Sequence, residues 1–258
     1  MRKEQSVKIL HDSNNDATAL CSYLSAISYQ HKKDQYDWLV ETFQLSDYYQ
    51  DETNYISYYT VKDEARKNFY VVIRGTHADN FKCWVLNMIV NLQFKLLEES
   101  CYKIHSGYRK CGEPILKKLV FSIKEAADKG YNVVFTGHSL GGAIAKYVAV
   151  KSELDESNIY TFGSPLLATD DFFDIDGTMH IRDYVISDDI ISFFPSRIFS
   201  KQPYFEIGSD NKLMEKIRPT NILHSRFLLN ELKIVFFYRS ILKNHAMDHY
   251  HRKVLKSI

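Results

Sequence analysis

The sequence predicts an α/β fold in which a mainly parallel central sheet is covered by helices on both faces. Short apolar, β-branched runs alternate along the chain with stretches of helical periodicity. One such run, Tyr131–Thr136, leads through a glycine-bracketed serine into the small apolar stretch Ala143–Ala149. The 258 residues, of which 45% are hydrophobic and 25% charged, are typical of one large globular domain. We therefore expect residues 1–258 to form a single domain.

The N-terminal part of the chain predicts one helix followed by a β-hairpin. Asn15–Tyr29 begins with capping residues and then places apolar side chains at helical spacing, at Leu20, Leu24 and Ile27. Tyr55–Val61 and Phe69–Ile73 are apolar runs that predict two strands, with the charged turn Asp63–Asn68 between them. This hairpin leads into the short segment Arg74–Thr76.

The segment between the hairpin and the serine is mixed. Ala78–Phe94 carries apolar side chains at helix-like offsets, and Ile104–Tyr108 reads as a short segment that contains a turn. Glu113–Lys129 has a clear apolar stripe at helical spacing, and Gly130 is placed where a helix commonly ends. We expect one long helix here, packed on the sheet.

Two further strands and a dense apolar stretch follow the serine. Asn158–Phe162 and Met179–Val185 have the composition of strands, whereas residues 198–242 show no clear pattern. Within that region, the apolar side chains of Phe227–Leu242 would wrap most of the way round a helix. This favours a buried helix packed against the sheet, and the alternative is a segment that contacts a lipid surface.

The serine lies in a G-x-S-x-G pattern, and the expected strand before it and helix after it are the context that this pattern needs. Gly137 and Gly141 flank Ser139, and Gly142 follows. In such an elbow the serine hydroxyl stands out at the sheet edge as a nucleophile. The next helix directs its N-terminal amides at the same place, so the backbone N–H of Leu140 is a candidate oxyanion donor. A tight turn without chemistry is the alternative.

A serine nucleophile needs a base, and the base needs an orienting acid, in the chain order serine, acid, histidine. Several aspartates follow the serine. Four lie in a polar cluster that is typical of a solvated loop, and one, Asp183, lies inside a predicted strand. Asp188 and Asp189 come directly after a predicted strand, where ligand sites of open α/β sheets lie. The four in the cluster are Asp170, Asp171, Asp174 and Asp176.

The histidines that could act as the base lie near the C-terminus. We set His138 aside, because neighbouring residues at a strand end point to opposite sides. The remaining candidates are His224, His245, His249 and His251. His245 and His249 are one helical turn apart, so a metal site is an alternative, but no carboxylate-rich partner set accompanies them. We therefore expect neither a metal ion nor an organic cofactor.

Seven short segments, taken together and in order, resemble the class 3 lipase family of α/β-hydrolases, which act on acylglycerols and related esters. The segments span residues 70–250 and end in a histidine motif. They are YVVIRGT (Tyr70–Thr76), W-x-x-N (Trp84, Asn87), IHSGY (Ile104–Tyr108), FTGHSLGGAIA (Phe135–Ala145), TFGSP (Thr161–Pro165), DIISFFP (Asp189–Pro195) and HAMDHY (His245–Tyr250).

The resemblance implies an α/β-hydrolase fold and selects among the candidate residues. Asp189 opens the acid pattern of the family in the correct phase, whereas Asp188 is one residue out of phase. The base of the family is followed by an aromatic residue, as His245 is followed by Tyr250. The threonine of the Arg-Gly-Thr segment lines the oxyanion hole in the family, so Thr76 is carried over to that role.

The resemblance also implies a mobile lid after the oxyanion segment. Ala78–Asn91 has that position in the chain, and its candidate substrate-contacting residues are Phe81, Trp84 and Met88. Family members commonly have aspartate before the tryptophan, whereas this chain has Cys83. The departure concerns packing near the lid and not the triad of Ser139, Asp189 and His245.

The expected function is that of a serine-dependent lipase that cleaves lipid esters, as in lipid degradation. Phospholipid cleavage or acyl transfer by the same triad is one alternative. A non-catalytic lipid-binding module with a hydrolase fold is another, and it predicts a broken triad. All three triad positions are filled in the expected order here.

The distribution of charge along the chain indicates which binding partners to expect. The net charge of +1 gives no global attraction to nucleic acid, but residues 196–258 carry twelve Lys/Arg and five Asp/Glu. We treat residues 196–242 as a basic and apolar insertion between acid and base, for which peripheral contact with a membrane or lipid-droplet surface is the alternative to a buried helix. No apolar run is long enough to span a bilayer, and no signal peptide is evident, so we expect a cytoplasmic protein with free thiols. The cysteines are Cys21, Cys83, Cys101 and Cys111.

Overall fold

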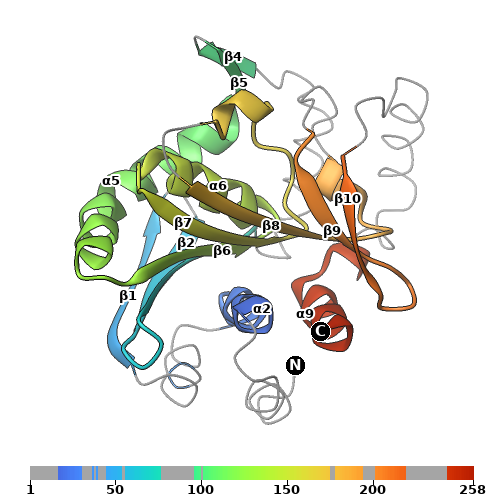
Figure 1. Cartoon of the computed structure of the whole chain (residues 1–258), viewed down its shortest axis with the longest axis horizontal. Coiled ribbons are helices and arrows are strands. Elements are labelled where there is room, and N and C mark those ends of the chain that lie inside the picture. Colours follow the sequence, from blue (N-terminus) through green and yellow to red (C-terminus); the bar gives the residue numbers. More distant parts are fainter. Residues whose placement is uncertain are drawn as a thin grey trace.

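The computed structural model describes residues 17–30, 37, 39, 45–53, 56–76, 96–99, 101–174, 178–193, 201–218 and 243–258. Its central feature is an eight-stranded sheet (Figure 1). Along the chain, the strands of this sheet are β1 (Leu45–Thr53), β2 (Ile56–Asp63), β3 (Asn68–Ile73), β6 (Asn132–His138), β7 (Glu156–Phe162), β8 (Thr178–Ile186), β9 (Pro203–Ile207) and β10 (Leu213–Ile217). The strand order across the sheet is β1-β2-β3-β6-β7-β8-β9-β10.

The sheet is mainly parallel, as predicted. Strands β3, β6, β7, β8 and β9 pair in parallel, and the crossover helices that such pairings need connect β3 to β6 and β6 to β7. The edge strands β1 and β10, and β2 next to β1, are antiparallel to their neighbours, so the predicted hairpin of β2 and β3 is confirmed. A separate two-stranded ladder joins β4 (Leu96–Glu99) to β5 (Tyr102–His105).

In the described part of the chain, four helices cover the two faces of the sheet (Figure 1). They are α2 (Ala17–Ile27), α5 (Ser106–Asp128), α6 (Leu140–Lys151) and α9 (Met247–Ser257). Helices α5 and α6 pack on one face and α2 and α9 on the other, so each face has its own hydrophobic core. Together with the parallel sheet, this confirms the predicted layered α/β arrangement.

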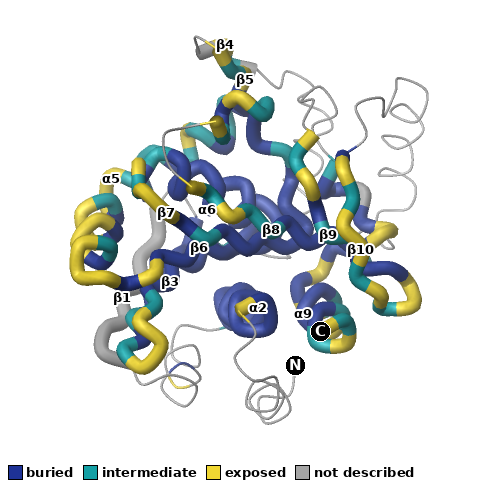
Figure 2. The backbone as a smooth tube through the Cα atoms, viewed as in Figure 1, coloured by how far each residue is buried: buried dark blue, intermediate teal, exposed yellow. Residues whose placement is uncertain are grey.

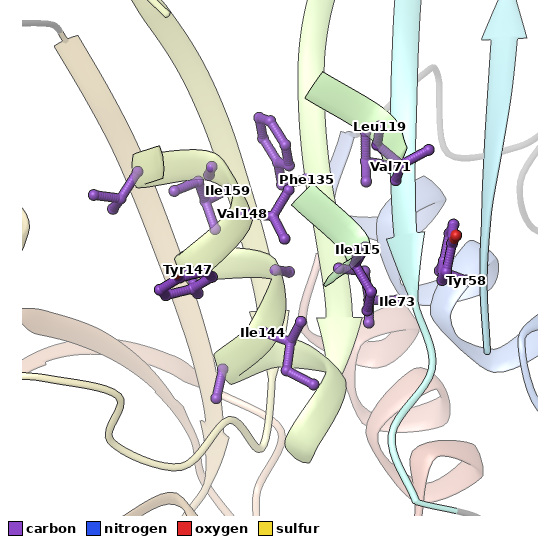
Figure 3. Packing of buried hydrophobic residues seen from close by; sticks show 14 of the residues in the cluster. Tyr58, Val71, Ile73, Ile115, Leu119, Phe135, Ile144, Tyr147, Val148 and Ile159 are labelled. Carbon is purple, nitrogen blue, oxygen red and sulfur yellow. The ribbon is translucent and has the colours of Figure 1, made fainter. Parts of the chain in front are cut away.

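Strand alternation divides the apolar side chains between the two cores. Val71 and Ile73 of β3 pack towards α5 and α6, whereas Tyr70 and Val72 pack towards α2 and α9, because successive strand residues point to opposite faces. Figure 3 shows the first core, where Phe135 and other strand residues meet the helices. Figure 2 shows the centre of the sheet as a buried layer between the helices of the two faces.

The structure extends one predicted element and adds two others. Helix α5 begins at Ser106 rather than near Glu113, because the His105 side chain caps it by accepting a hydrogen bond from the Tyr108 amide at 3.3 Å. The segment predicted as a turn is therefore the end of β5 and the start of α5. Strands β9 and β10 lie in the region where the sequence pattern was unclear, and they extend the main sheet.

Several expectations fall outside the described residues. The helix-like Ala78–Phe94 and the apolar Phe227–Leu242 both lie there, as does Cys83. The other three cysteines, Cys21, Cys101 and Cys111, are free thiols. The single domain over residues 1–258 and the insertion over residues 196–242 stay predictions.

Candidate active site

Ser139 forms the connection between β6 and α6 and has an unusual backbone conformation. Its φ of 55° and ψ of −131° lie in a region that residues with a side chain rarely adopt. Such strain persists only where the surroundings impose it, and it is typical of functional sites. The turn is therefore the sharp elbow that the G-x-S-x-G pattern predicts.

The glycines on either side of the serine are required by close backbone contacts. A Cβ on Gly141 would lie 2.1 Å from the carbonyl oxygen of Ile73, at the end of the neighbouring strand β3. A Cβ on Gly137 would lie 2.6 Å from the backbone of Gly141. Any side chain at either position would push β3 away from the elbow, so these glycines hold the nucleophile against the end of β3.

A continuous chain of hydrogen bonds joins the serine to the predicted base and acid. Ser139 Oγ lies 2.7 Å from His245 Nε2, and His245 Nδ1 lies 2.7 Å from Asp189 Oδ2. All three residues are at most 2% exposed. The structure thus brings together, from three distant parts of the chain, the residues that chain order and the family motifs singled out. Their catalytic roles stay a prediction.

Asp189 is held in place by its own turn. It follows β8, and its amide donates to the Ile186 carbonyl at 2.8 Å. The Ile191 amide donates to Oδ1 at 3.0 Å, and Ser192 Oγ donates to Oδ2 at 3.3 Å. These bonds orient the carboxylate so that Oδ2 faces His245.

Tyr250 completes the surroundings of the acid from helix α9. Its hydroxyl donates to Asp189 Oδ2 at 2.5 Å and accepts from the Ile186 amide at 3.1 Å. Burial, the Asp189 charge and the bond to it raise the pKa of Tyr250 well above its ordinary value, so the phenol remains a donor. The sequence pattern marked Tyr250 only as an aromatic residue after the base. Its hydrogen bond to the acid could not be read from that pattern.

His138 lies beside the proposed base. Its ring centroid is 4.8 Å from that of His245, and its Nε2 donates to the His245 carbonyl oxygen at 2.7 Å. Burial and the neighbouring His245 lower the pKa of His138 far below the ordinary value. The ring is therefore neutral, and its Nδ1 accepts from the Tyr29 hydroxyl at 2.8 Å. Both ring nitrogens are used, as expected of a neighbour that is not the base.

The oxyanion candidates lie next to the elbow. Thr76 follows Gly75, whose Cβ, if present, would be 3.1 Å from the Cβ of Ser139. Among the described residues, the Thr76 hydroxyl is a buried group without a hydrogen-bond partner. Helix α6 begins at Leu140, so its first amides have no acceptor within the helix. The Gly142 amide is already bonded to the Ser139 carbonyl oxygen at 2.9 Å, so the Leu140 amide and Thr76 stay the predicted oxyanion donors.

The other acidic candidates that the structure describes are engaged elsewhere or exposed, as Asp171 and Asp174 are, and Asp176 lies outside the described residues. Asp183 is buried and paired with Lys146 and Arg218, and Asp188 is exposed. Asp170 accepts from the Lys201 amide. None of these contacts involves the triad.

The structure describes two of the remaining histidine candidates and none of the lid candidates. His251 is buried, and its Nδ1 lies 2.9 Å from Ser22 Oγ. His249 is partly buried, while His224 and the lid candidates Phe81, Trp84 and Met88 lie outside the described residues. Across the described part of the chain, no group of three or more potential ligand side chains could hold a metal ion.

Comparison with known proteins identifies the family. The profile described as "Lipase (class 3)" matches residues 70–199, which is half of the chain and includes Ser139 and Asp189. The chain therefore belongs to the class 3 lipase family, and the resemblance seen in its motifs is confirmed.

Two relatives illustrate the match at the level of sequence. The "Secreted mono- and diacylglycerol lipase 1" of Fusarium solani is 32% identical over 121 residues, which cover 45% of this chain and 35% of that protein. A "Lipase" of Rhizopus oryzae is 27% identical over 145 residues, covering 49% of this chain and 36% of the relative. The match thus spans only about a third of the length of either relative.

Solved structures show the same fold. A mutant form of the protein MDLA from Penicillium cyclopium superimposes with a TM-score of 0.63 at 17% identity, covering 84% of this chain and 94% of that one. The Rhizomucor miehei triacylglyceride lipase gives a TM-score of 0.61 at 19% identity, with coverages of 88% and 91%. The predicted α/β-hydrolase fold is confirmed.

Because three histidines are buried, we expect the free energy of unfolding to fall as the pH is lowered. Burial lowers the pKa of His105 and of His251 to about 4, and burial together with His245 lowers that of His138 well below its ordinary value. The unfolded chain then binds more protons below the ordinary histidine pKa of about 6.5. The stabilisation is complete above that pH and is lost as the pH falls towards 4. Each group should lower the free energy of unfolding by up to about 1.4 kcal/mol per pH unit in that range.

Urea unfolding at pH 7, 6 and 5 measures this effect. The His251→Gln variant should show a shallower dependence on pH, whereas His180→Gln, at an exposed position, should match the parent. A free energy of unfolding that stays constant between pH 7 and pH 5 would show that these histidines are not buried in the neutral form.

Proposed function

We propose that this protein is a serine-dependent carboxylic ester hydrolase that cleaves acylglycerols or related lipid esters through an acyl-enzyme on Ser139. The observation that carries the proposal is the unbroken hydrogen-bond chain from Asp189 through His245 to Ser139 at a strained elbow. Nucleophile, base and orienting acid in hydrogen-bond contact are the arrangement that activates a serine hydroxyl.

In the proposed acylation step, Ser139 Oγ attacks the ester carbonyl carbon while His245 Nε2 takes the hydroxyl proton. Asp189 keeps the imidazole in the tautomer that accepts at Nε2 and stabilises the cation that forms. The backbone amides of Thr76 and Leu140 would bind the oxygen that becomes negative. Removing one such donor costs about 2.7–4 kcal/mol of transition-state stabilisation in enzymes of this kind. The alcohol then leaves with the proton from His245.

The second step would release the acid. A water molecule gives a proton to His245 and attacks the acyl carbon, and the tetrahedral intermediate collapses to return the proton to Ser139 Oγ. The free fatty acid departs and the enzyme is restored. Every proton in this cycle is carried by His245, so the proposed reaction uses the side chains of the chain itself.

The lipid substrate is inferred from the relatives and from burial. The Fusarium relative is by its name a mono- and diacylglycerol lipase, and another similar structure is described as a triacylglycerol lipase with a serine protease triad. Ser139 is 1% exposed, so the proposed reaction requires the site to open to an ester. This supports a lid, and its assignment to Ala78–Asn91 with Phe81, Trp84 and Met88 stays a prediction.

Contact with a lipid surface is part of the same proposal. Lipid esters are presented in aggregates, and the basic character of residues 196–258 would favour an anionic surface. Within the described part of the chain, no helix is long and apolar enough to cross a bilayer. A cytoplasmic location stays a prediction, whereas the Fusarium relative is by its name a secreted protein.

A panel of p-nitrophenyl esters and acylglycerols, run on the parent protein and on Ser139→Ala, tests the function. We expect release of fatty acid by the parent and none above background by the variant. Adding alcohol acceptors and phospholipids to the panel separates hydrolysis from acyl transfer and phospholipid cleavage. A parent protein that binds lipid but cleaves no ester would contradict the proposal and favour a non-catalytic binding module.

A further inference from the structure

A buried ionic cluster lies behind the acid-bearing turn. It consists of Lys146 on α6, Asp183 on β8 and Arg218 just after β10, and each of these residues is at most 4% exposed. Charged side chains are almost never buried to this extent unless they are paired. Neither the proposed reaction nor the family motifs in the sequence assign a role to Lys146 or Arg218.

Asp183 is the centre of this cluster. Its Oδ1 accepts from Thr161 Oγ1 at 2.7 Å, and its Oδ2 accepts from Lys146 Nζ at 2.7 Å and from Arg218 Nη2. Burial opposes ionisation of the carboxyl, but the two cations outweigh it and lower the pKa of Asp183. One carboxylate thus faces two cations, so either cation alone would suffice to balance its charge.

Arg218 differs from Lys146 because it makes a second contact, with the turn that carries the acid. Its Nη1 donates to the Ser192 carbonyl oxygen at 2.8 Å, while Nη2 remains on Asp183. Its guanidinium also lies over two aromatic rings, 5.7 Å from the centroid of Phe193 and 5.2 Å from that of Tyr204. The planar guanidinium group of Arg218 is therefore held by Asp183, by the Ser192 carbonyl and by the two aromatic rings.

Ser192, whose carbonyl oxygen Arg218 contacts, is itself hydrogen-bonded to Asp189. Ser192 lies in the short 3-10 turn Ile190–Phe193, and its hydroxyl donates to Asp189 Oδ2, the oxygen that faces His245. The same turn supplies the Ile191 amide to the other carboxylate oxygen. A shift of this turn would move both donors, and with them the direction of the carboxylate.

We propose that Arg218 is a positioning residue for the reaction: anchored on Asp183, it holds the turn after Asp189 so that the carboxylate faces His245. The inference rests on the proposed ester hydrolysis. Arginine suits this role because its rigid fork serves two acceptors at once, whereas a lysine ammonium is a single point charge on a flexible stem. Strand β10 thereby contributes to the site through the residue that follows it.

The chain offers a matched control in the same cluster. Arg218→Met removes one buried cation and the contact with Ser192, and Asp183 keeps Lys146. Lys146→Met removes the other buried cation, Asp183 keeps Arg218, and the contact with Ser192 remains. Because an ion pair survives in both variants, neither leaves Asp183 without a partner, and both should fold. Their difference isolates the contact with the turn.

The experiment measures kcat and KM for ester hydrolysis in the parent and in three variants. We expect Arg218→Met to lower kcat about 10- to 100-fold with KM little changed, since small misplacements of catalytic groups have effects of this size. Lys146→Met should stay within about twofold of the parent, as expected for a group outside the path. Arg218→Lys keeps the charge but cannot bridge both acceptors, so it should resemble Arg218→Met.

A spectroscopic readout separates positioning from a merely structural role. The deshielded proton between His245 Nδ1 and Asp189 should shift or broaden in the NMR spectra of both Arg218 variants and not in that of Lys146→Met. Equal kcat in Arg218→Met and Lys146→Met, or full activity in Arg218→Lys, would overturn the inference. If the parent itself hydrolyses no ester, the proposed function fails instead, and the NMR comparison still decides whether Arg218 orients the acid.

Discussion

Replacing Ser139 or His245 by alanine will each remove almost all ester hydrolysis, and the double variant will be little worse than either single one. The two side chains share one hydrogen bond of 2.7 Å and act in the same step, so the loss of either leaves the other without a function. In a serine protease with this arrangement, either loss lowers kcat by about 10⁶-fold. The measurement is kcat for a soluble ester in the three variants.

The matched control for this prediction is His249→Ala. His249 lies one helical turn from His245 in the chain, but it is only partly buried and not bonded to Ser139. We expect its replacement to leave kcat close to that of the parent. If His249→Ala abolished turnover while His245→Ala preserved it, the assignment of the base would be wrong.

Gly141→Ala will disrupt the elbow itself. The new Cβ would lie 2.1 Å from the Ile73 oxygen, 2.7 Å from the Arg74 carbonyl carbon and 2.8 Å from the Gly75 nitrogen. All three are backbone atoms, so the clash can be relieved only by moving the end of β3 away from α6. Overpacking of this kind costs about 3 kcal/mol of stability. Because the displaced segment leads to Thr76, activity should fall as well.

Chemical unfolding and an ester assay measure the two effects. Gly208→Ala is the control, since its Cβ would approach closely only Asp210 Oδ1, at 2.7 Å, which is the end of a flexible side chain, and would stay 3.7 Å from the Lys212 carbonyl oxygen. We expect that variant to resemble the parent in both measurements. Parent-like stability and activity in Gly141→Ala would contradict the close contact between the elbow and the end of β3.

The fold was predictable where local pattern and topology agree. The apolar run that became β6, the glycines around Ser139 and the small residues of α6 each have a local signature, and their order implies a parallel sheet. Helix α5 was placed correctly from its apolar stripe, but its start was missed because the cap at His105 depends on a single side-chain contact. Strands β9 and β10 have weak patterns, since they are short and lie near the edge of the sheet.

In the candidate site, the triad residues could be predicted from the sequence, whereas the contacts around them could not. Chain order and motif phase selected Ser139, Asp189 and His245, because an elbow and a fixed order of partners constrain where each can lie. The contacts of His138 and Arg218 could not be predicted, since each joins segments far apart in the sequence. Alternation along the strand predicted that His138 is a satisfied neighbour and not the base, and both of its ring nitrogens are hydrogen-bonded to groups other than Ser139.

The most direct test of the central claim is covalent capture of the nucleophile. The parent protein is incubated with a lipid-like alkyl phosphonate that reacts with activated serines, and the modified peptide is identified by mass spectrometry. The account predicts one adduct, on Ser139, together with complete loss of ester hydrolysis and no labelling of the His245→Ala variant over the same time. An active protein that carries its adduct on any other serine, or that keeps its activity when Ser139 is modified, would contradict it.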